Sequence, residues 1–387
     1  MPALLVQNKK PGTMHYNAAK VYKMNLSNVI NEAVSYIHSS ETAKNDAATA
    51  LLKLKNENLS TLGSKELHEE RLLYDVKKSG LDFSVGGVDS GFVDKKLPSL
   101  DLVLVRSVGV LFVYENNLIK EARYIPGYYQ FPLPHLTNHA LELDEFNCSK
   151  SLIRLKEEVN SAKHLIRSFK PKYLFLDGSI IPQYQDKPRK DSSINDLYHS
   201  IIREFQDLYE EAEKNNVILI GCVEDSRGSR FRSILQEEIL PHKNAIPPEK
   251  LDFLFDSALL DHLLAVGERT FAFSYTKNIS QHPILNDFDK KWSERIYSFY
   301  LKPSLYDRPL RVEFIKSGEL KQQVDHIASV VYALSCLHRE YAYPSILIEA
   351  DLRARLKPEE IDIVYNKILD KIGKNIKMKL RRDSRPF

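Results

Sequence analysis

The sequence predicts an α/β fold: a mixed sheet with crossover helices, elaborated by helices at the N-terminal and C-terminal ends. Apolar runs from Phe83 onward follow one another with short turns between them, as antiparallel strands do. Two later apolar runs each follow a long amphipathic helical pattern, which is the connection that a parallel strand needs. The chain has 387 residues, 43% of them hydrophobic, so it holds enough material for one large core.

Residues 1–80 predict a short N-terminal arm followed by helix. The arm combines "MPALLV" with the basic "NKK", and the text after it, "VINEAVSYIHSSETAKNDAATALLKLKNENL", has apolar residues at helical intervals. We expect this segment to serve in partner docking or dimer formation. Residues 81–387 are expected to form the main domain, with insertions.

Three strands are predicted after this segment, and the apolar part of the first ends at a carboxylate, Asp89. Their sequences are "FSVGGVDSGFV", "LDLVLVRSVGVLFVYENN" and "LIKEARYIPGYY". Val, Leu and Tyr are frequent in them, as is typical of strands. Asn116 and Asn117 predict a hairpin turn between the second strand and the third.

Alternating helices and strands are predicted next. The helical pattern "SKSLIRLKEEVNSAKHLIRSF" leads to "YLFLDGSI", a buried strand that ends at Asp177, and "INDLYHSIIREFQDLYEEAEKNN" leads in the same way to "VILIGCVEDSRGSR". Farther on, "RPLRVEFIK" predicts a strand, and "QQVDHIASVVYALSCLHREY" and "KPEEIDIVYNKILDKIGK" predict helices. The ending "KNIKMKLRRDSRPF" predicts a solvated basic tail.

Composition narrows the class of protein. Lys+Arg 55 against Asp+Glu 52 gives a formal charge of +3, so any basic surface must be local. The three cysteines, Cys148, Cys222 and Cys336, are far apart and suggest neither a disulfide framework nor a cysteine zinc site. No apolar run is long enough to span a bilayer. We therefore expect a soluble cytoplasmic protein with no membrane partner.

Three of the predicted strands run into an acidic turn: "GGVDSG" with Asp89, "LFLDGS" with Asp177 and "GCVEDSRGS" with Asp225. Carboxylates that meet at the rim of a sheet repel one another, and a divalent cation relieves the repulsion. Hard oxygen ligands favour Mg²⁺ or Mn²⁺ over zinc. The alternative for each motif is an ordinary turn or helix N-cap.

These motifs resemble those of the NurA family of archaeal and bacterial nucleases, which share a ribonuclease-H-like core. The resemblance covers Phe83 to about Arg355. It rests on "GVDSG", "RLKEEVNSAKHLIRSFKPKYLFLDGS", "LIGCVEDSRGS", "RPLRVEF" and "YAYPSILIEADLRARL", in that order.

The resemblance implies a set of metal ligands. Asp89 matches the acid on the first core strand, and Asp177 matches the second strand-end acid. A glutamate on the helix before that strand completes the group, and "RLKEEV" offers Glu157 and Glu158. Glu158 is preferred because it flanks the apolar stripe of the helix, although either glutamate can be a surface charge. Asp351 stands where many family members have a histidine after the alanine; as an aspartate it is expected to ligate metal directly.

Further residues are expected to contact DNA. Arg227 and Arg230, in "VEDSRGSR", suit bidentate contact with a phosphate, and a solvated loop arginine is the alternative. Tyr343, at the "YP" before a strand expected over "SILIEADL", is placed to orient a phosphate or a water; a packed aromatic is the alternative.

The activity implied is that of a deoxyribonuclease dependent on Mn²⁺ or Mg²⁺, with 5′ to 3′ exonuclease and single-strand endonuclease activities. The resemblance also implies a homodimer that works with a hexameric HerA-type ATPase, and with Mre11 and Rad50, in end resection for double-strand break repair. The N-terminal arm is the expected docking segment for the ATPase. Two alternatives are a non-catalytic nucleic-acid-binding module on the same fold and an actin-like or sugar-kinase ATPase, although no P-loop lysine motif occurs.

Overall fold

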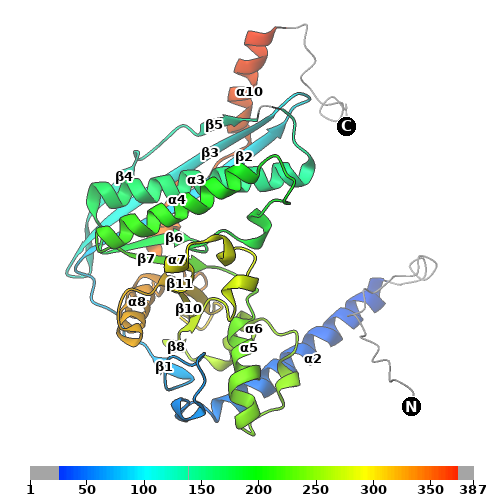
Figure 1. Cartoon of the computed structure of the whole chain (residues 1–387), viewed down its shortest axis with the longest axis vertical. Coiled ribbons are helices and arrows are strands. Elements are labelled where there is room, and N and C mark those ends of the chain that lie inside the picture. The colour runs from blue at the N-terminus through cyan, green and yellow to red at the C-terminus, as the bar shows by residue number, and fades with distance from the viewer. Residues whose placement is uncertain (1–25, 138, 374–387) are drawn as a thin grey trace.

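An eleven-stranded sheet runs through the computed structural model, which describes residues 26–137 and 139–373 (Figure 1). Its neighbouring strands follow the order β1-β8-β10-β11-β7-β6-β2-β3-β4, with β5 beside β3 and β9 beside β10. The strands are β1 (Leu73–Asp75), β2 (Ser84–Lys96), β3 (Asp101–Glu115), β4 (Leu118–Ile125), β5 (Leu133–Leu136), β6 (Tyr173–Asp177), β7 (Ile218–Val223), β8 (Glu268–Thr270), β9 (Phe273–Ser274), β10 (Ile296–Leu301) and β11 (Leu310–Ile315).

The antiparallel strands predicted from the apolar runs are present. β2 pairs with β3 and β3 with β4, all antiparallel. The turn between β3 and β4 is made by Asn116 and Asn117, whose φ angles of 51° and 66° fall in the left-handed region that asparagine tolerates. The hairpin prediction is therefore confirmed.

The crossover helices are also present. α3 (Leu143–Phe169) connects the meander to β6, and α4 (Asn195–Lys214) connects β6 to β7. β6 runs parallel to both β2 and β7. The order β4-β3-β2-β6-β7 is thus an antiparallel meander extended by two parallel strands, which confirms the mixed, ribonuclease-H-like sheet.

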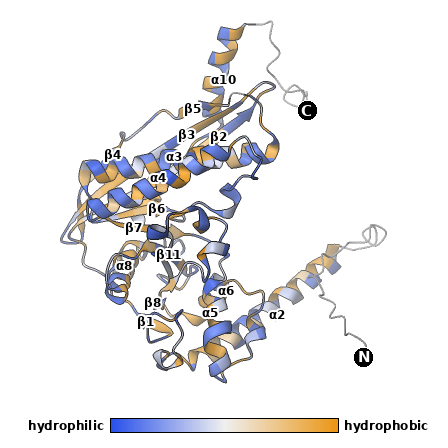
Figure 2. Cartoon of the chain, viewed as in Figure 1, coloured by the Kyte–Doolittle hydropathy of each residue, from blue (hydrophilic) through white to orange (hydrophobic). Residues whose placement is uncertain are grey.

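Helices cover both faces of this sheet. α3 and α4 lie on one face, where Leu152 and Phe205 pack in one cluster with Val88 and Leu174. α8 (Leu320–Ser335) and α9 (Ser345–Ala354) lie on the other face, in a cluster that includes Val85, Phe175 and Ile346. Figure 2 shows hydrophobic and hydrophilic residues along both α3 and α4, as expected for helices with one side on a sheet and one in water.

Two local predictions were wrong. β2 does not stop at Asp89 but continues to Lys96, because β3 supplies an antiparallel partner along its whole length. What stops at Asp89 is the parallel pairing with β6, whose last pair is Val88 with Leu176. The segment after Tyr343 is the helix α9 and not a strand, since its buried residues Ile346, Leu347, Ala350 and Ala354 recur at helical spacing.

The N-terminal helix α2 (Leu26–Leu52) buries its C-terminal end at Ala47, Ala48 and Leu51, in a cluster that also holds residues of α6 (Asp256–Leu263). β1 joins the sheet beside β8. The division of the chain at residue 80 stays a prediction. The expected arm before Leu26 and basic tail after Gly373 lie outside the described residues.

The remaining helices are short, apart from α10 near the C-terminal end. They are α5 (Arg230–Ile234), α7 (Lys290–Ser293) and α10 (Pro358–Ile372), with single turns at Ser60–Leu62, Tyr184–Asp186, Leu235–Ile239, Leu240–His242, Pro248–Leu251, Ile279–Gln281 and Leu285–Asp287. In the part of the chain that the structure describes, no helix has the length and apolar character needed to cross a bilayer.

Candidate metal centre on the central sheet

Asp89 and Asp177 lie side by side on neighbouring strands. Val88 of β2 is paired with Leu176 of β6, so the next residue on each parallel strand is an aspartate. Asp89 is only 5% exposed. Burial raises its pKa to about 8, and the negative charges of Asp177 and Glu158 add to the rise. The pair therefore concentrates unfavourable negative charge at the end of the parallel strands.

α9 packs directly over the strand that carries Asp89. A Cβ atom at Gly87 would lie 3.0 Å from the Ile346 carbonyl oxygen, and one at Gly91 would lie 2.7 Å from that of Ala354. Successive odd positions of a strand share a face, so Asp89 points toward α9 from between the two glycines. The glycines are needed because any larger side chain would push the helix off the strand.

Asp351 lies on this helix and is exposed. Its negative charge, together with that of Asp177, contributes to raising the pKa of Tyr341, for which burial is the main cause. The structure does not bond Asp351 to Asp89, Asp177 or Glu158 among the described residues, so its role as a ligand stays a prediction.

Glu158 reaches the same region from α3, on the opposite face of the sheet. It is 4% exposed, and its carboxylate accepts hydrogen bonds from Ser90 Oγ (2.6 Å) and Arg154 Nη1 (2.8 Å). Burial raises its pKa to about 7, against the opposing effect of the Arg154 charge. Glu157 points elsewhere, with Oε1 3.7 Å from His135 Nε2. Glu158, rather than Glu157, therefore bonds the residue next to Asp89, and its charge helps to raise the Asp89 pKa.

Tyr343 holds Asp177. Its hydroxyl donates to Asp177 Oδ1 and lies 2.8 Å from the Cys222 carbonyl oxygen, while its ring is buried. Burial raises its pKa well above the ordinary tyrosine value. Tyr343 is therefore a packed aromatic that orients a candidate ligand, and its expected contact with a phosphate or a water stays a prediction.

The arginines expected to contact DNA lie apart from the carboxylates. Arg230 has a side chain that is only 12% exposed and is paired with Glu66. Arg227 is exposed, in a pocket that also includes Asp225 and Arg308. Asp225 follows β7 with its side chain 82% exposed and 3.3 Å from Arg308 Nη1, so it does not join Asp89 and Asp177.

Sequence reasoning missed the residues that support the centre. Glu313 on β11 is buried, accepts hydrogen bonds from Ser179 Oγ (2.6 Å) and Ile180 N (3.2 Å), and pairs with Arg311 at 2.9 Å. It therefore fixes the loop directly after Asp177. The acid in "RVEF", inside an otherwise apolar strand, is the signal that could have found it.

Tyr341 and Glu224 form a second supporting pair. The Tyr341 hydroxyl donates to Glu224, and the Tyr341 ring stacks on that of Tyr343 at 5.7 Å between centroids. Burial raises the pKa of Glu224, and the charge of Asp177 adds to the rise. Neither residue stood out in the sequence, because tyrosine and glutamate are both common beside strands and turns.

The donor set suits a hard divalent cation. Asp89, Asp177 and Glu158 offer carboxylate oxygens, the ligands that Mg²⁺ and Mn²⁺ prefer. Within residues 26–137 and 139–373, however, no three His, Cys, Asp or Glu side chains are arranged to hold an ion together. The chemistry of the donors therefore fits a metal. The full set of three is not assembled, because the Glu158 carboxylate is turned to Arg154 and Ser90.

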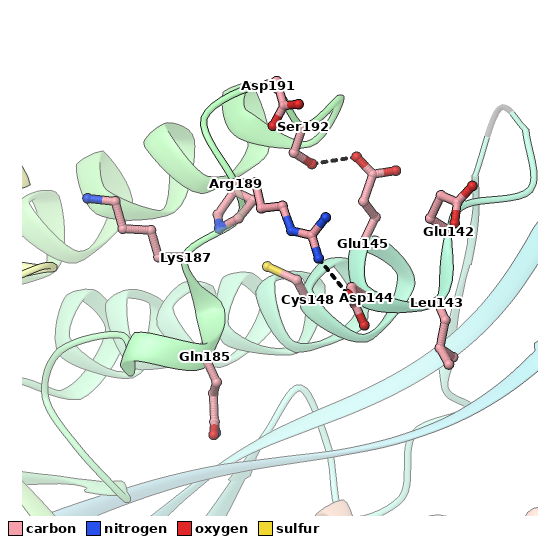
Figure 3. A pocket seen from close by; sticks show the side chains of 11 residues that line it. Glu142, Leu143, Asp144, Glu145, Cys148, Gln185, Lys187, Arg189, Asp191 and Ser192 are labelled. Atoms are coloured by element: carbon pink, nitrogen blue, oxygen red, sulfur yellow. Dashed lines mark hydrogen bonds and ion pairs between the residues drawn. The ribbon is translucent and has the colours of Figure 1, made fainter. Parts of the chain in front are cut away.

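A different pocket lies at the start of α3 and is distinct from this centre. Figure 3 shows Arg189 directed at Asp144 and Ser192 at Glu145, with Cys148 nearby. The two contacts are 3.0 Å and 2.6 Å long. None of the residues of the candidate metal centre lines this pocket.

The strand order and the neighbouring aspartates define a ribonuclease-H-like nuclease core. The family model for the NurA domain matches residues 83–356. The chain therefore belongs to the NurA family of nucleases.

Solved structures give distant likenesses. The NurA nuclease from Sulfolobus solfataricus is 16% identical, with 94% of this chain and 98% of that chain covered and a TM-score of 0.48. A NurA structure with manganese is 10% identical, with 89% and 98% covered and a TM-score of 0.45. A NurA bound to dAMP and manganese is 10% identical, with 93% and 98% covered and a TM-score of 0.41. No curated protein sequence matches the chain.

Proposed function

We propose that this protein is a DNA nuclease that depends on Mn²⁺ or Mg²⁺ held by Asp89, Glu158, Asp177 and Asp351. The observation that carries the proposal is the in-register pair of Asp89 and Asp177, where a carboxylate is buried beside another at a cost that a cation would offset. Membership of the NurA family supports it, as does the NurA structure that holds dAMP and manganese.

The chain's own residues position the reaction. β2 and β3 fix the backbone of Asp89, and the Tyr343 hydroxyl fixes Asp177. Arg154 and Ser90 hold the Glu158 carboxylate, which would hold the ion together with Asp89 and Asp177. A bound divalent ion supplies activation of water and stabilisation of the leaving oxygen in phosphodiester hydrolysis.

The deciding experiment is cleavage of 5′-labelled single-stranded DNA by the purified protein with Mn²⁺, with Mg²⁺ and with EDTA. We expect cleavage with a metal, none with EDTA, and none by Asp89→Asn. Asp225→Asn is the matched control, because Asp225 also follows a strand of the sheet but is exposed and apart from the pair. Cleavage that persists in EDTA or in Asp89→Asn would contradict the proposal. An absence of cleavage with both metals would favour the alternative function, a non-catalytic nucleic-acid-binding module.

The finer activities proposed are 5′ to 3′ exonuclease and single-strand endonuclease action. DNA labelled at the 5′ end should release labelled mononucleotides first if digestion begins at that end. Circular single-stranded DNA, which has no ends, should be cut only by the endonuclease activity. Release of labelled mononucleotides from 3′-labelled DNA before release from 5′-labelled DNA would exclude the proposed polarity.

The proposed setting is the cytoplasm, in double-strand break repair, as a homodimer with a HerA-type ATPase and in a pathway with Mre11 and Rad50. The support is the family assignment. A pull-down of a HerA-type ATPase with the full chain and with a chain starting at Ser40 tests the docking arm. Retention of the ATPase by the shorter chain would exclude the arm as the docking segment. Sedimentation of the full chain measures whether it forms a dimer.

A further inference from the structure

Three aromatic side chains are exposed in the segment between β4 and β5, which Figure 1 shows along one edge of the molecule. Tyr128 is 60% exposed, Tyr129 is 73% exposed and Phe131 is 47% exposed. We call these three residues the aromatic platform. Large apolar rings gathered on a surface mark a binding site more often than scattered ones do.

Each tyrosine of the platform is backed by an arginine. The guanidinium carbon of Arg353 lies 4.1 Å from the centre of the Tyr128 ring, and that of Arg106 lies 5.1 Å from the centre of the Tyr129 ring. The Tyr124 ring also meets Tyr128 edge-on at 5.0 Å. The rings are therefore supported on the protein side and exposed on the other.

Arg106 is built into the structure. It is 4% exposed, and it donates to the carbonyl oxygens of Gln130 (2.7 Å) and Arg355 (2.9 Å) and pairs with Glu360. It thereby ties the platform to the C-terminal end of α9. A surface held in place before its ligand arrives loses less entropy on binding.

The platform lies close to the candidate metal centre. Arg106 of β3 is paired with Gly91 of β2, and Gly91 is two positions beyond Asp89 on the same face of the sheet. Arg353 lies on α9, the helix that covers the strand of Asp89, and it points to the platform side of that helix, where it meets Tyr128. A strand of nucleic acid that reaches Asp89 can therefore place its neighbouring bases on the platform.

We propose that the aromatic platform binds single-stranded DNA by stacking its bases on Tyr128, Tyr129 and Phe131. Proteins that bind single strands without regard to sequence combine exposed rings with arginine, and every base offers a flat face for such contacts. The choice of ligand rests on the proposed nuclease function. The candidate metal centre on the same face of the sheet, which would take a nucleic acid as its substrate, favours a nucleic acid over a protein partner.

The test measures the binding of a fluorescent 12-nucleotide oligothymidine to the full chain by anisotropy, in EDTA and separately in Ca²⁺. We expect the variant Tyr128→Ala/Tyr129→Ala to bind at least about tenfold more weakly than the parent, since one stacked base alone is worth about that much. Tyr128→Phe/Tyr129→Phe should bind nearly as well, because phenylalanine keeps the ring. Tyr184→Ala and Tyr306→Ala are matched controls, with parent tyrosines that are 74% and 66% exposed outside the platform.

Several outcomes overturn the proposal. They are no binding by the parent in either buffer, unchanged binding by the alanine variant, and equal losses in the alanine and phenylalanine variants. A variant that binds DNA normally but sediments as a smaller species would assign the surface to contact between copies of the chain instead. Loss of binding in the alanine variant, combined with no cleavage by the parent in Mn²⁺, would uphold the platform and reject the nuclease.

Discussion

At the scale of single residues, the centre is a concentration of buried negative charge. Asp89 and Glu158 are each almost fully buried, and both have a raised pKa because burial disfavours the charged form. Only Glu158 has a cation bonded to it, Arg154. The centre therefore lowers the stability of the metal-free protein at neutral pH, as expected of a site that is completed by a bound cation.

The first prediction concerns that cost. The Asp89 pKa is raised from 3.8 to about 8, so the folded state binds more protons than the unfolded one, and stability is lost as pH rises from about 4 to about 8. In EDTA at pH 8, Asp89→Asn should raise the free energy of unfolding by about 1–3 kcal/mol, with a much smaller effect at pH 4. Urea unfolding at both pH values checks this. Asp225→Asn, at an exposed position, should change little at either pH; a destabilised Asp89→Asn at pH 8 would refute the argument.

The second prediction separates the two neighbouring glutamates. Glu158→Gln should lower cleavage by more than about a hundredfold, because even groups that only support metal ligands are worth about 10–100-fold. Glu157→Gln should leave cleavage within about twofold, since Glu157 lies by His135. The rates of labelled-DNA cleavage in saturating Mn²⁺ measure both. Equal losses of cleavage in the two variants would mean that any change at this place on α3 lowers cleavage and that Glu158 has no role of its own.

At the scale of elements, the centre depends on how α9 and β11 meet the central strands. α9 approaches β2 closely because Gly87 and Gly91 have no side chains. On the other side, the buried pair of Arg311 and Glu313 on β11 holds the loop that follows β6. Both elements come late in the chain, yet they set the surroundings of acids that come early.

The third prediction tests the approach of α9. Gly91→Ala should destabilise the protein by about 1–3 kcal/mol. The new Cβ would lie 2.7 Å from the Ala354 carbonyl oxygen, so the backbone of α9 or β2 must move. Gly318→Ala is the matched control, since nothing lies within 4 Å of its Cβ position. Thermal and urea unfolding measure the difference. Equal stability of the two variants would show that α9 does not press on β2.

The fourth prediction tests the support from β11. Glu313→Ala leaves Arg311 buried without its carboxylate and should cost about 3 kcal/mol or more of stability. Glu294→Ala, at an exposed position on the surface, should cost less than about 0.5 kcal/mol. Urea unfolding at pH 7 compares them. A small loss for Glu313→Ala would mean that the pair contributes little to holding the loop.

At the scale of the whole molecule, electrostatics gives little attraction for DNA. The formal charge is only +3, and the arginines at the platform are already paired, Arg353 with Glu349 and Arg106 with Glu360. These two arginines are therefore not free to neutralise phosphates. Binding should therefore depend on stacking more than on counterion release.

The fifth prediction follows from this balance of charge. For about two phosphate contacts to a single strand, raising salt from 50 to 200 mM should weaken binding by about sevenfold. Anisotropy titrations in EDTA across that range measure the slope. A loss of about a hundredfold or more would indicate some five phosphate contacts, and would contradict binding by stacking.

The sequence by itself determined the order of the core elements and the identity of the central acids. The apolar runs of the strands and the helical period in α3 and α4 are local properties, so they could be recognised without the fold. The turn at Asn116 and Asn117 is equally local. Asp89 and Asp177 could be found because each follows an apolar run directly, although the same pattern also marked Asp225, which lies apart from them.

Only the tertiary structure decided what surrounds those acids. The parallel register put Asp177 beside Asp89, the glycines of β2 admitted α9, and Tyr343, Glu313 and Arg154 supplied the bonds that hold the carboxylates. It also made α9 a helix where a strand was expected, and it left Arg230 paired with Glu66. These features arise between segments far apart in the chain, and the cost of a buried charge depends on neighbours that sequence order does not specify.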